Sequence, residues 1–328
     1  MKNLCFYLVL MVVALATTFV LTKKIIPKFT MIAKQPIYGD GPSWHMKKSG
    51  TPTMGGIGFI IPSIALAAMM SFLFFKSGDI NTGASLLIST VFCLFNALVG
   101  IWDDITKILR SKNAGLTPKQ KLIFQVIIAA MFLLARNVIL SDDTRLWFGD
   151  LCLDIGFFYY PIALIFILGI VNCSNLTDGI DGLEASVSFA IAVTTFLISM
   201  KTSNDAWILS IIGIGATLGF LFFNIHPAKI FMGDTGSLFL GALCVCYSFS
   251  LNSLPAYILI GGVYVIEGIS VIAQVISFKA FGKRIFKMAP LHHHLEKCGL
   301  DENKICIYAI LTTFILSAFA SMLIKGGK

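Results

Sequence analysis

The sequence predicts an all-α polytopic membrane protein, a bundle of about ten transmembrane helices. The first observation is composition: 57% of the 328 residues are hydrophobic, 13% are charged, and the mean hydropathy is +0.86. A soluble domain carries about a quarter charged residues. The second observation is that the apolar residues form runs near the roughly 20 residues needed to cross a bilayer. These runs do not alternate as barrel strands do, so we expect helices.

Ten apolar runs follow one another along the chain. The first run is longer than the core of about 7–15 residues in a cleavable signal peptide, so we expect it to remain as a helix. No convincing internal repeat appears, and we treat 1–328 as a single integral membrane domain. The expected spans are 4–22, 54–75, 83–102, 119–140, 156–172, 183–200, 206–225, 235–253, 255–278 and 305–324.

The lysines and arginines predict the orientation of these spans. With ten spans, eighteen of the 25 basic residues fall on one side and seven on the other. The positive-inside rule places the richer side in the cytoplasm and both termini outside. The net charge of +8 then suits topology, anionic lipid and phosphate substrates, and we find no nucleic-acid motif. All the polar motifs described below fall on this cytoplasmic side, which predicts one active site there.

Asp103 and Asp104 end the third expected span. Adjacent carboxylates repel each other, so the pair implies a nearby cation, either a metal or a lysine. The alternative is an acidic pair that simply reaches interfacial water.

Two lysines follow at the start of the next span. Thr117 is expected to cap a helix and Pro118 to open it. Lys119 and Lys121 would then lie at a helix start, where free backbone donors favour a phosphate. Taken alone, each lysine is also typical of a topological charge.

Four amide or carboxylate residues recur at every third position after the fifth span, namely Asn172, Asn175, Asp178 and Asp181. On a continuous helix this spacing keeps neighbours on one side, although Gly179 and Gly182 indicate that the helix loosens. Such groups suit a sugar, a nucleobase edge or a hydrated metal. A polar capping loop is the simpler alternative.

Asn224 ends the seventh span, and the segment FMGDTGS at 231–237 begins the eighth. Glycines beside Asp234 let the backbone approach a ligand closely. Its carboxylate is a hard oxygen ligand suited to magnesium. Phe231 could stack on a base, although a phenylalanine here is also typical of membrane packing.

Three consecutive histidines, His292, His293 and His294, suggest zinc, which we disfavour. Successive side chains on a helix point about 100° apart, and no cysteine pair is spaced to complete a tetrahedral site. Donation to a pyrophosphate or a sugar is the better interpretation, and a polar loop is the alternative. Glu267 lies within the ninth span, where a carboxylate indicates function unless a helix break admits water.

Intramembrane carboxylates also mark ion-coupled transporters. In a transporter these groups should lie near the middle of the membrane and be reachable from both sides. Here they gather at span ends on one face, which favours catalysis at the interface.

Five segments together resemble a known family: PTMGG (52–56), the Asp103-Asp104 pair, NLTDGIDGL (175–183), FMGDTGSL (231–238) and APLHHHLE (289–296). They resemble the bacterial phospho-N-acetylmuramoyl-pentapeptide transferases, a branch of the polyprenyl-phosphate N-acetylhexosamine 1-phosphate transferase superfamily. The resemblance extends from about residue 35 to 300 with every motif in order. The acidic motifs are shared across the superfamily, whereas PTMGG and the histidines look specific to this branch.

The resemblance implies a reaction at the bacterial cytoplasmic (inner) membrane. Undecaprenyl phosphate attacks the sugar-linked phosphate of UDP-N-acetylmuramoyl-pentapeptide, UMP leaves, and lipid I forms for peptidoglycan synthesis, with Mg²⁺ required. The closest competing interpretation is a sister transferase that uses UDP-N-acetylglucosamine. The sequence does not fix the oligomeric state, and a homodimer is compatible with the resemblance.

The resemblance also implies roles for individual residues. Asp103 is the candidate base near the lipid phosphate, Asp104 supports the electrostatics of lysine and metal, and Asp234 ligates magnesium, so all three are candidate metal ligands. The residues expected to line the nucleotide side are Lys48, Thr53, Asn172, Asn175, Asp178, Asp181, Asn224 and Phe231. The residues expected to handle the phosphates and the sugar are Lys119, Lys121, His292, His293 and His294.

Direct attack by the lipid phosphate is favoured over a covalent aspartyl-phosphate. A phosphate monoester has a second pKa near 6, so the nucleophile is largely a dianion at neutral pH. The harder task is to bring two anions together, which calls for Mg²⁺ and lysine. A covalent route through an aspartate stays open as the alternative.

Overall fold

The computed structural model describes residues 4–32, 48, 50–110, 115–202 and 205–324. Six of the basic residues counted above lie outside the described residues: Lys2, Lys34, Lys47, Lys112, Lys325 and Lys328.

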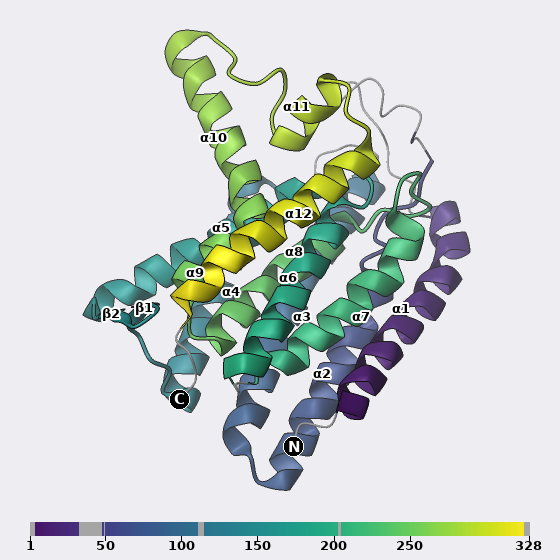
Figure 1. The fold of residues 1–328 in the computed structure, drawn as a ribbon. Coiled ribbons are helices and arrows are strands. Elements are labelled where there is room, and N and C mark those ends of the chain that lie inside the picture. The colour runs from purple at the N-terminus through teal and green to yellow at the C-terminus, as the bar shows by residue number, and fades with distance from the viewer. Residues whose placement is uncertain (1–3, 33–47, 49, 111–114, 203–204, 325–328) are drawn as a thin grey trace.

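The described residues form a bundle of helices with one short hairpin (Figure 1). The long helices are α1 (Leu4–Ile32), α2 (Ile57–Ser77), α3 (Ile80–Arg110), α4 (Pro118–Ala135), α5 (Tyr159–Thr177), α6 (Leu183–Thr202), α7 (Ala206–Asn224), α8 (Gly233–Ser250), α10 (Gly262–Phe281) and α12 (Glu302–Ala320). The short elements are η2 (Arg136–Leu140), β1 (Leu146–Phe148), β2 (Leu151–Leu153), η3 (Gly156–Phe158), α9 (Leu254–Ile260), α11 (Leu291–Lys297) and η4 (Ser321–Leu323).

The helical bundle confirms the all-α polytopic fold. Within the described ranges, nine helices are long and apolar enough to cross a membrane. The remaining expected span, the eighth (235–253), is the helix α8. Its polar first turn makes it less apolar than the other spans, and it lies almost wholly buried among its neighbours. The expected span 255–278 is divided at Gly261 into α9 and α10.

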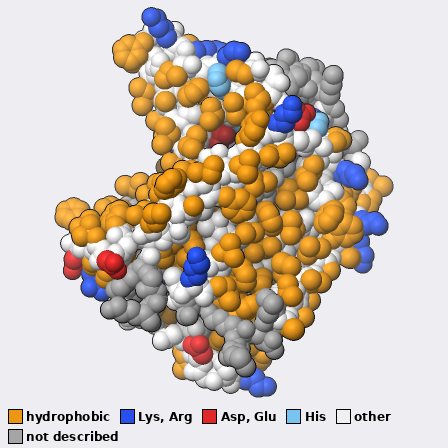
Figure 2. Space-filling view, viewed as in Figure 1, with side chains coloured by type: hydrophobic (Ala, Val, Ile, Leu, Met, Phe, Trp, Pro, Cys, Tyr) orange, Lys and Arg blue, Asp and Glu red, His pale blue; other side chains and the backbone are white. Residues whose placement is uncertain are grey.

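The sides of the bundle are apolar, as an integral membrane protein requires. Figure 2 shows hydrophobic side chains over much of the visible face, with charged side chains mainly toward its ends and edges. Large residues such as Leu134, Ile165 and Phe222 are 63%, 70% and 64% exposed. In water such exposure would be costly, whereas lipid tails accept it.

Small residues bring α8 close to its neighbours. A Cβ on Gly100 of α3 would lie 2.2 Å from the backbone oxygen of Asp234, and one on Gly241 would lie 2.9 Å from Cβ of Ser174 on α5. Small residues at helix interfaces allow backbones to approach in membranes. The packing therefore fixes the end of α3 and the body of α5 against α8.

The polar motifs and the hairpin lie at different parts of the bundle. In Figure 1 α10 projects beyond the other helices, with α11 beside it. The antiparallel strands β1 and β2 lie away from this end. Gly149 N, in their turn, donates to Leu323 O at 2.7 Å, which joins the hairpin to η4.

Candidate active site

Three aspartates converge where α3 ends and α8 begins. Asp103 and Asp104 belong to α3 and are each 3% exposed, and Asp234 lies in the first turn of α8. One carboxylate oxygen from each lies within 4.8 Å of the others. Carboxylate oxygens at this spacing are suited to a hard divalent cation. Packing of α3 on α8 thus creates a group of acidic ligands from positions far apart in the sequence.

Lys107 lies among these carboxylates. Its Nζ is 2.6 Å from Asp103 Oδ2, 3.0 Å from Asp234 Oδ1 and 3.9 Å from Asp104 Oδ1. The residue was not among the candidates selected from the sequence. Its position four residues after Asp103, on the same helical face, is the signal that could have found it.

Lys121 approaches the same aspartate from α4. Its Nζ donates to Asp234 Oδ2 at 2.7 Å and to Asn175 Oδ1 at 2.9 Å. Lys119 is exposed and forms no ion pair or hydrogen bond within the described part of the chain. The helix begins as expected, because Thr117 and Gln120 form a reciprocal capping box and Pro118 is the first helical residue. The structure therefore brings only one of the two expected lysines into the cluster.

Asp103 and Asp104 are held by different parts of the chain. Asp104 Oδ2 accepts from Thr235 N at 2.9 Å and from Thr235 Oγ1 at 2.7 Å, so it anchors the start of α8. Asp103 Oδ1 accepts from Leu116 N at 2.7 Å. Asp103 therefore ties the cluster to the segment before α4, and its other oxygen faces Lys107.

Gly233 is required where α8 begins. Its φ is +71°, which L side chains adopt rarely, and a Cβ there would lie 2.5 Å from Asp104 Oδ2 and 2.8 Å from Thr53 Oγ1. Thr53 is 7% exposed. The PTMGG segment thus lies directly beside the aspartate cluster.

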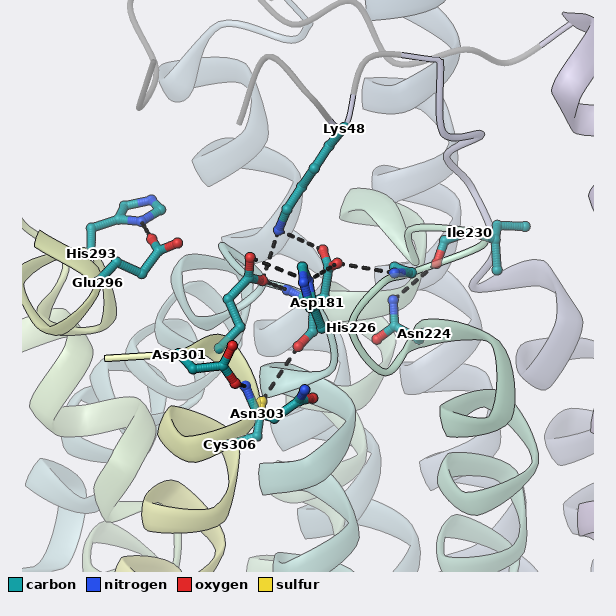
Figure 3. A network of polar contacts seen from close by, with 12 residues as sticks. Lys48, Asp181, Asn224, His226, Ile230, His293, Glu296, Asp301, Asn303 and Cys306 are labelled. Carbon is teal, nitrogen blue, oxygen red and sulfur yellow. Dashed lines mark hydrogen bonds and ion pairs between the residues drawn. The ribbon is translucent and has the colours of Figure 1, made fainter. Parts of the chain in front are cut away.

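A second polar cluster surrounds Lys48 (Figure 3). Lys48 Nζ lies 2.7 Å from Asp181 Oδ1 and 2.7 Å from Glu302 Oε2. His226 Nδ1 lies 2.9 Å from Asp181 Oδ2. The carboxylates of Asp181 and Glu302 with His226 could hold a metal, but the ammonium group of Lys48 already pairs with both carboxylates. His226 and Glu302 were not selected from the sequence, since nothing local shows that α12 starts beside this loop.

The loop between α7 and α8 joins the two clusters. Ala228 N donates to Asp181 Oδ2 at 3.0 Å, and Asn224 Nδ2 donates to Ile230 O at 2.9 Å. Phe231 N then donates to Pro52 O at 2.8 Å. Asn224 and Phe231 therefore shape the loop that leads from Asp181 to Gly233.

The four residues at every third position do not form one face. The helix α5 ends at Thr177, so the expected loosening is confirmed. Asn172 Nδ2 donates to Gln125 Oε1 at 2.9 Å, Asn175 faces Lys121, and Asp181 faces Lys48.

Asp178 directly follows the last residue of α5. It lies between the aspartate cluster and the cluster around Lys48. Burial, followed by the neighbouring acidic groups, raises the pKa of its carboxyl well above the usual range. Its carboxylate makes no hydrogen bond to the described residues.

The three histidines have separate surroundings. His292 is fully buried, with Nδ1 3.2 Å from Glu267 Oε2, whereas His293 Nδ1 lies 2.6 Å from Glu296 Oε2. His294 Nδ1 accepts from Lys287 N at 3.1 Å. The rings of His292 and His293 lie 4.2 Å apart between centroids, but the candidate metal-binding groups among the described residues do not include the histidines of α11.

His292 adjoins the loop after α5. A Cβ on Gly179 would lie 2.1 Å from His292 Nε2, so the ring occupies the space that glycine leaves. Glu267 is 4% exposed and faces this histidine rather than open water. The α11 segment is thereby joined to the loop that carries Asp178 and Asp181.

Comparison with known proteins identifies relatives over most of the chain. Residues 84–252 match the family model described as glycosyl transferase family 4. The chain is 42% identical over 306 residues to the phospho-N-acetylmuramoyl-pentapeptide-transferase of Halalkalibacterium halodurans, covering 90% of this chain and 92% of the relative.

Two further relatives carry the same name. The protein of Bacillus subtilis is 43% identical over 275 residues, with 83% of each chain covered. That of Oceanobacillus iheyensis is 44% identical over 321 residues, covering 94% of this chain and 93% of the relative. The chain therefore belongs to glycosyl transferase family 4 and, within it, to the phospho-N-acetylmuramoyl-pentapeptide-transferases.

Proposed function

We propose that this enzyme transfers phospho-N-acetylmuramoyl-pentapeptide from its UDP-linked precursor to undecaprenyl phosphate, giving lipid I and UMP in peptidoglycan synthesis. The observation that carries the proposal is the meeting of three aspartates with Lys107 and Lys121 where membrane helices end. A transfer between a water-soluble nucleotide and a lipid phosphate needs charged groups at such a boundary. Membership of the transferase family supports the same conclusion.

The metal that this site would hold is Mg²⁺. Asp103, Asp104 and Asp234 supply oxygen ligands at a suitable mutual spacing, and the two oxygens of Asp234 each lie beside a lysine ammonium group. Bound there, Mg²⁺ would neutralise charge on the phosphates of the two substrates. Because Asp104 also caps α8, we assign it mainly to positioning and Asp234 and Asp103 mainly to the metal and the lysines.

The lysines of the cluster hold the phosphates. Lys107 and Lys121 place two positive charges beside Asp234, and such charges favour the approach of one anion to another. The lipid phosphate is already largely a dianion at neutral pH. Asp103 would act near it only as an acceptor of the proton on the minor monoanionic fraction. Since the dianion can attack directly, no aspartyl nucleophile is needed, and the proposed transfer is a single displacement.

The nucleotide lies along the second cluster and the loop before α8. Lys48 and Asp181 supply a charged pair. Phe231 lies in the loop before α8, next to Ile230, whose carbonyl oxygen accepts a hydrogen bond from the side chain of Asn224. We place the uridine there. The remaining residues assigned to this side are Thr53, Asn172, Asn175 and Asp178.

The sugar and pyrophosphate lie toward α11. Its three histidines offer donors to oxygen-rich groups, and His292 adjoins the loop of Asp178. Lys119, exposed at the start of α4, is assigned to the approach of phosphate.

The proposed topology places the active site on the cytoplasmic side of the inner membrane and both termini outside. The excess of basic residues on the side of the motifs supports this orientation. We propose a single catalytic domain over 1–328 and a homodimer as the oligomer.

The test is UMP release by purified protein given polyprenyl phosphate and either of two UDP-sugars. We expect Mg²⁺-dependent release with UDP-N-acetylmuramoyl-pentapeptide and none with UDP-N-acetylglucosamine. The opposite preference would show a sister transferase. Release with neither sugar, combined with ion-driven substrate movement in vesicles, would show a transporter.

A further inference from the structure

Glu184 is a buried acid behind the active site that the reaction above does not use. It lies in the first turn of α6 and is fully buried. Its Oε1 lies 2.8 Å from Ser174 Oγ on α5, 3.1 Å from Ser188 Oγ on α6 and 2.8 Å from the hydroxyl of Tyr264 on α10. One carboxyl group thus joins three helices.

The hydrogens available to this network are too few for an ionised carboxylate. Ser174 Oγ also lies 2.8 Å from Ser237 O, and Ser188 Oγ lies 2.7 Å from the Tyr264 hydroxyl. These five oxygen–oxygen contacts share three hydroxyl hydrogens, so an ionised Glu184 leaves two contacts without a hydrogen, whereas a neutral acid leaves one. A hydrogen between the two oxygens is what makes a contact this short favourable. The Ser237 carbonyl has none, so Ser174 donates there, and its contact with Glu184 requires a hydrogen on the acid.

The second carboxyl oxygen gives the same result. Glu184 Oε2 is buried without a hydrogen-bond partner. A buried charge without a donor costs far more than a neutral carbonyl oxygen in the same place. Within the described residues no lysine, arginine or histidine pairs with Glu184, and its neighbours Asp178, Cys244 and Tyr264 bring no positive charge.

A helix start favours a negative charge, which would stabilise an ionised Glu184. However, the groups within hydrogen-bond reach of its Oε1 are side-chain hydroxyls, and its Oε2 has none. The local donors therefore do not compensate for an ionised carboxylate.

We propose that Glu184 is a neutral carboxylic acid whose hydrogen bond to Ser174 positions Asn175 and Ser237 in the active site. The positioning role rests on the proposed function. Ser174 precedes Asn175, which donates to Ser237 Oγ at 2.8 Å and accepts from Lys121 at 2.9 Å. The chain of contacts runs from Glu184 through Ser174 to the Ser237 carbonyl. It holds α5 against α8 directly behind the lysine that pairs with Asp234.

Two substitutions of similar volume distinguish a neutral acid from an ion. Glu184→Gln supplies hydrogens to Ser174, as a neutral acid does, whereas Glu184→Leu supplies none. We expect E184Q to keep kcat within about threefold of the wild type, because a substitution that preserves the contacts of a residue has only a small effect. We expect E184L to lower kcat at least about tenfold, because loss of the hydrogen bond to Ser174 would displace Asn175 and Ser237, and small displacements in an active site slow the reaction strongly. Equal damage by both, in a preparation whose wild type is active, would overturn the proposal.

Infrared spectroscopy reports the protonation state without an activity assay. We expect the wild type to show the carbonyl band of a protonated carboxylic acid at neutral and mildly alkaline pH, and E184Q to lack it. An unchanged spectrum in E184Q would overturn the neutral acid. If the wild type transfers no phospho-sugar, the proposed function fails, but the infrared result still decides the protonation state.

A combined variant tests positioning against general stabilisation. If Glu184 acts through Asn175, E184L should add little loss to Asn175→Ala, since both remove one set of contacts. Losses that multiply instead would show a structural role alone. If E184L does not fold, Ser174→Ala in the same background replaces it, with the same two outcomes.

Discussion

Replacing Lys107 by glutamine should weaken turnover strongly. Its Nζ lies 2.6 Å from Asp103 and 3.0 Å from Asp234, and its side chain is 29% exposed. Removing one partner of a buried ion pair costs roughly 3–5 kcal/mol. Water screens part of this charge, so we expect about 2 kcal/mol. If that stabilisation acts in the transition state, turnover falls roughly 30-fold.

The matched control is Lys24→Gln, which removes an equal charge from an exposed lysine of α1 that has no assigned role in the site. UMP release at saturating Mg²⁺ measures both variants, and K24Q should stay within about threefold of the wild type. K107Q should also need less Mg²⁺ for half-maximal activity, because the ammonium group no longer competes for the carboxylates. Near-normal turnover in K107Q, or equal losses in both variants, would refute the assignment of Lys107 to the cluster.

Three further outcomes follow from the two clusters. Asp234→Ala should abolish Mg²⁺-dependent UMP release while the protein keeps its thermal unfolding profile; residual metal-dependent activity would exclude this carboxylate as a ligand. Lys121→Gln should cost roughly tenfold in kcat and Lys121→Arg less, since arginine keeps the charge but changes its geometry; full turnover in K121Q would make this lysine a topological charge. Delipidated enzyme given UDP-sugar alone should release no stoichiometric UMP, with copurified lipid phosphate measured in the same sample; a phospho-aspartate that polyprenyl phosphate consumes would establish the covalent route.

Much of the fold was predictable because the hydropathy of a segment depends only on the residues of that segment. Each long apolar run became a helix, since a chain in lipid must satisfy its own backbone hydrogen bonds. The start of α4 was also readable, because Thr117 and Pro118 carry their capping chemistry within one turn. The division of the ninth span at Gly261 was not predicted, because the apolar run continues across it.

The candidate site was predictable in part. The aspartates were selected because a charge beside the hydrocarbon region is costly unless it has a partner or a function. The structure brings Asp103, Asp104 and Asp234 together. The equal spacing of the four polar residues in 172–181 suggested that they share one helical face. The helix α5 ends at Thr177, inside this segment, so the four side chains face different partners. The sequence shows where a charged residue lies along the chain, but it does not show which residue of a neighbouring helix that charge will contact.

The membrane bundle and the polar motifs could be predicted from local sequence, because both depend on residues close together along the chain. The packing of the helices was needed to show that Lys107 joins the aspartates, that Lys119 does not, and that Glu302 reaches Asp181 from the start of α12. The contacts of Lys107 depend on how closely α3 approaches α8, which Gly100 permits, and the contact of Glu302 depends on how α12 packs beside the loop after α5. Since interhelical distance is set by the packing of every neighbouring side chain at once, no single segment of sequence encodes it.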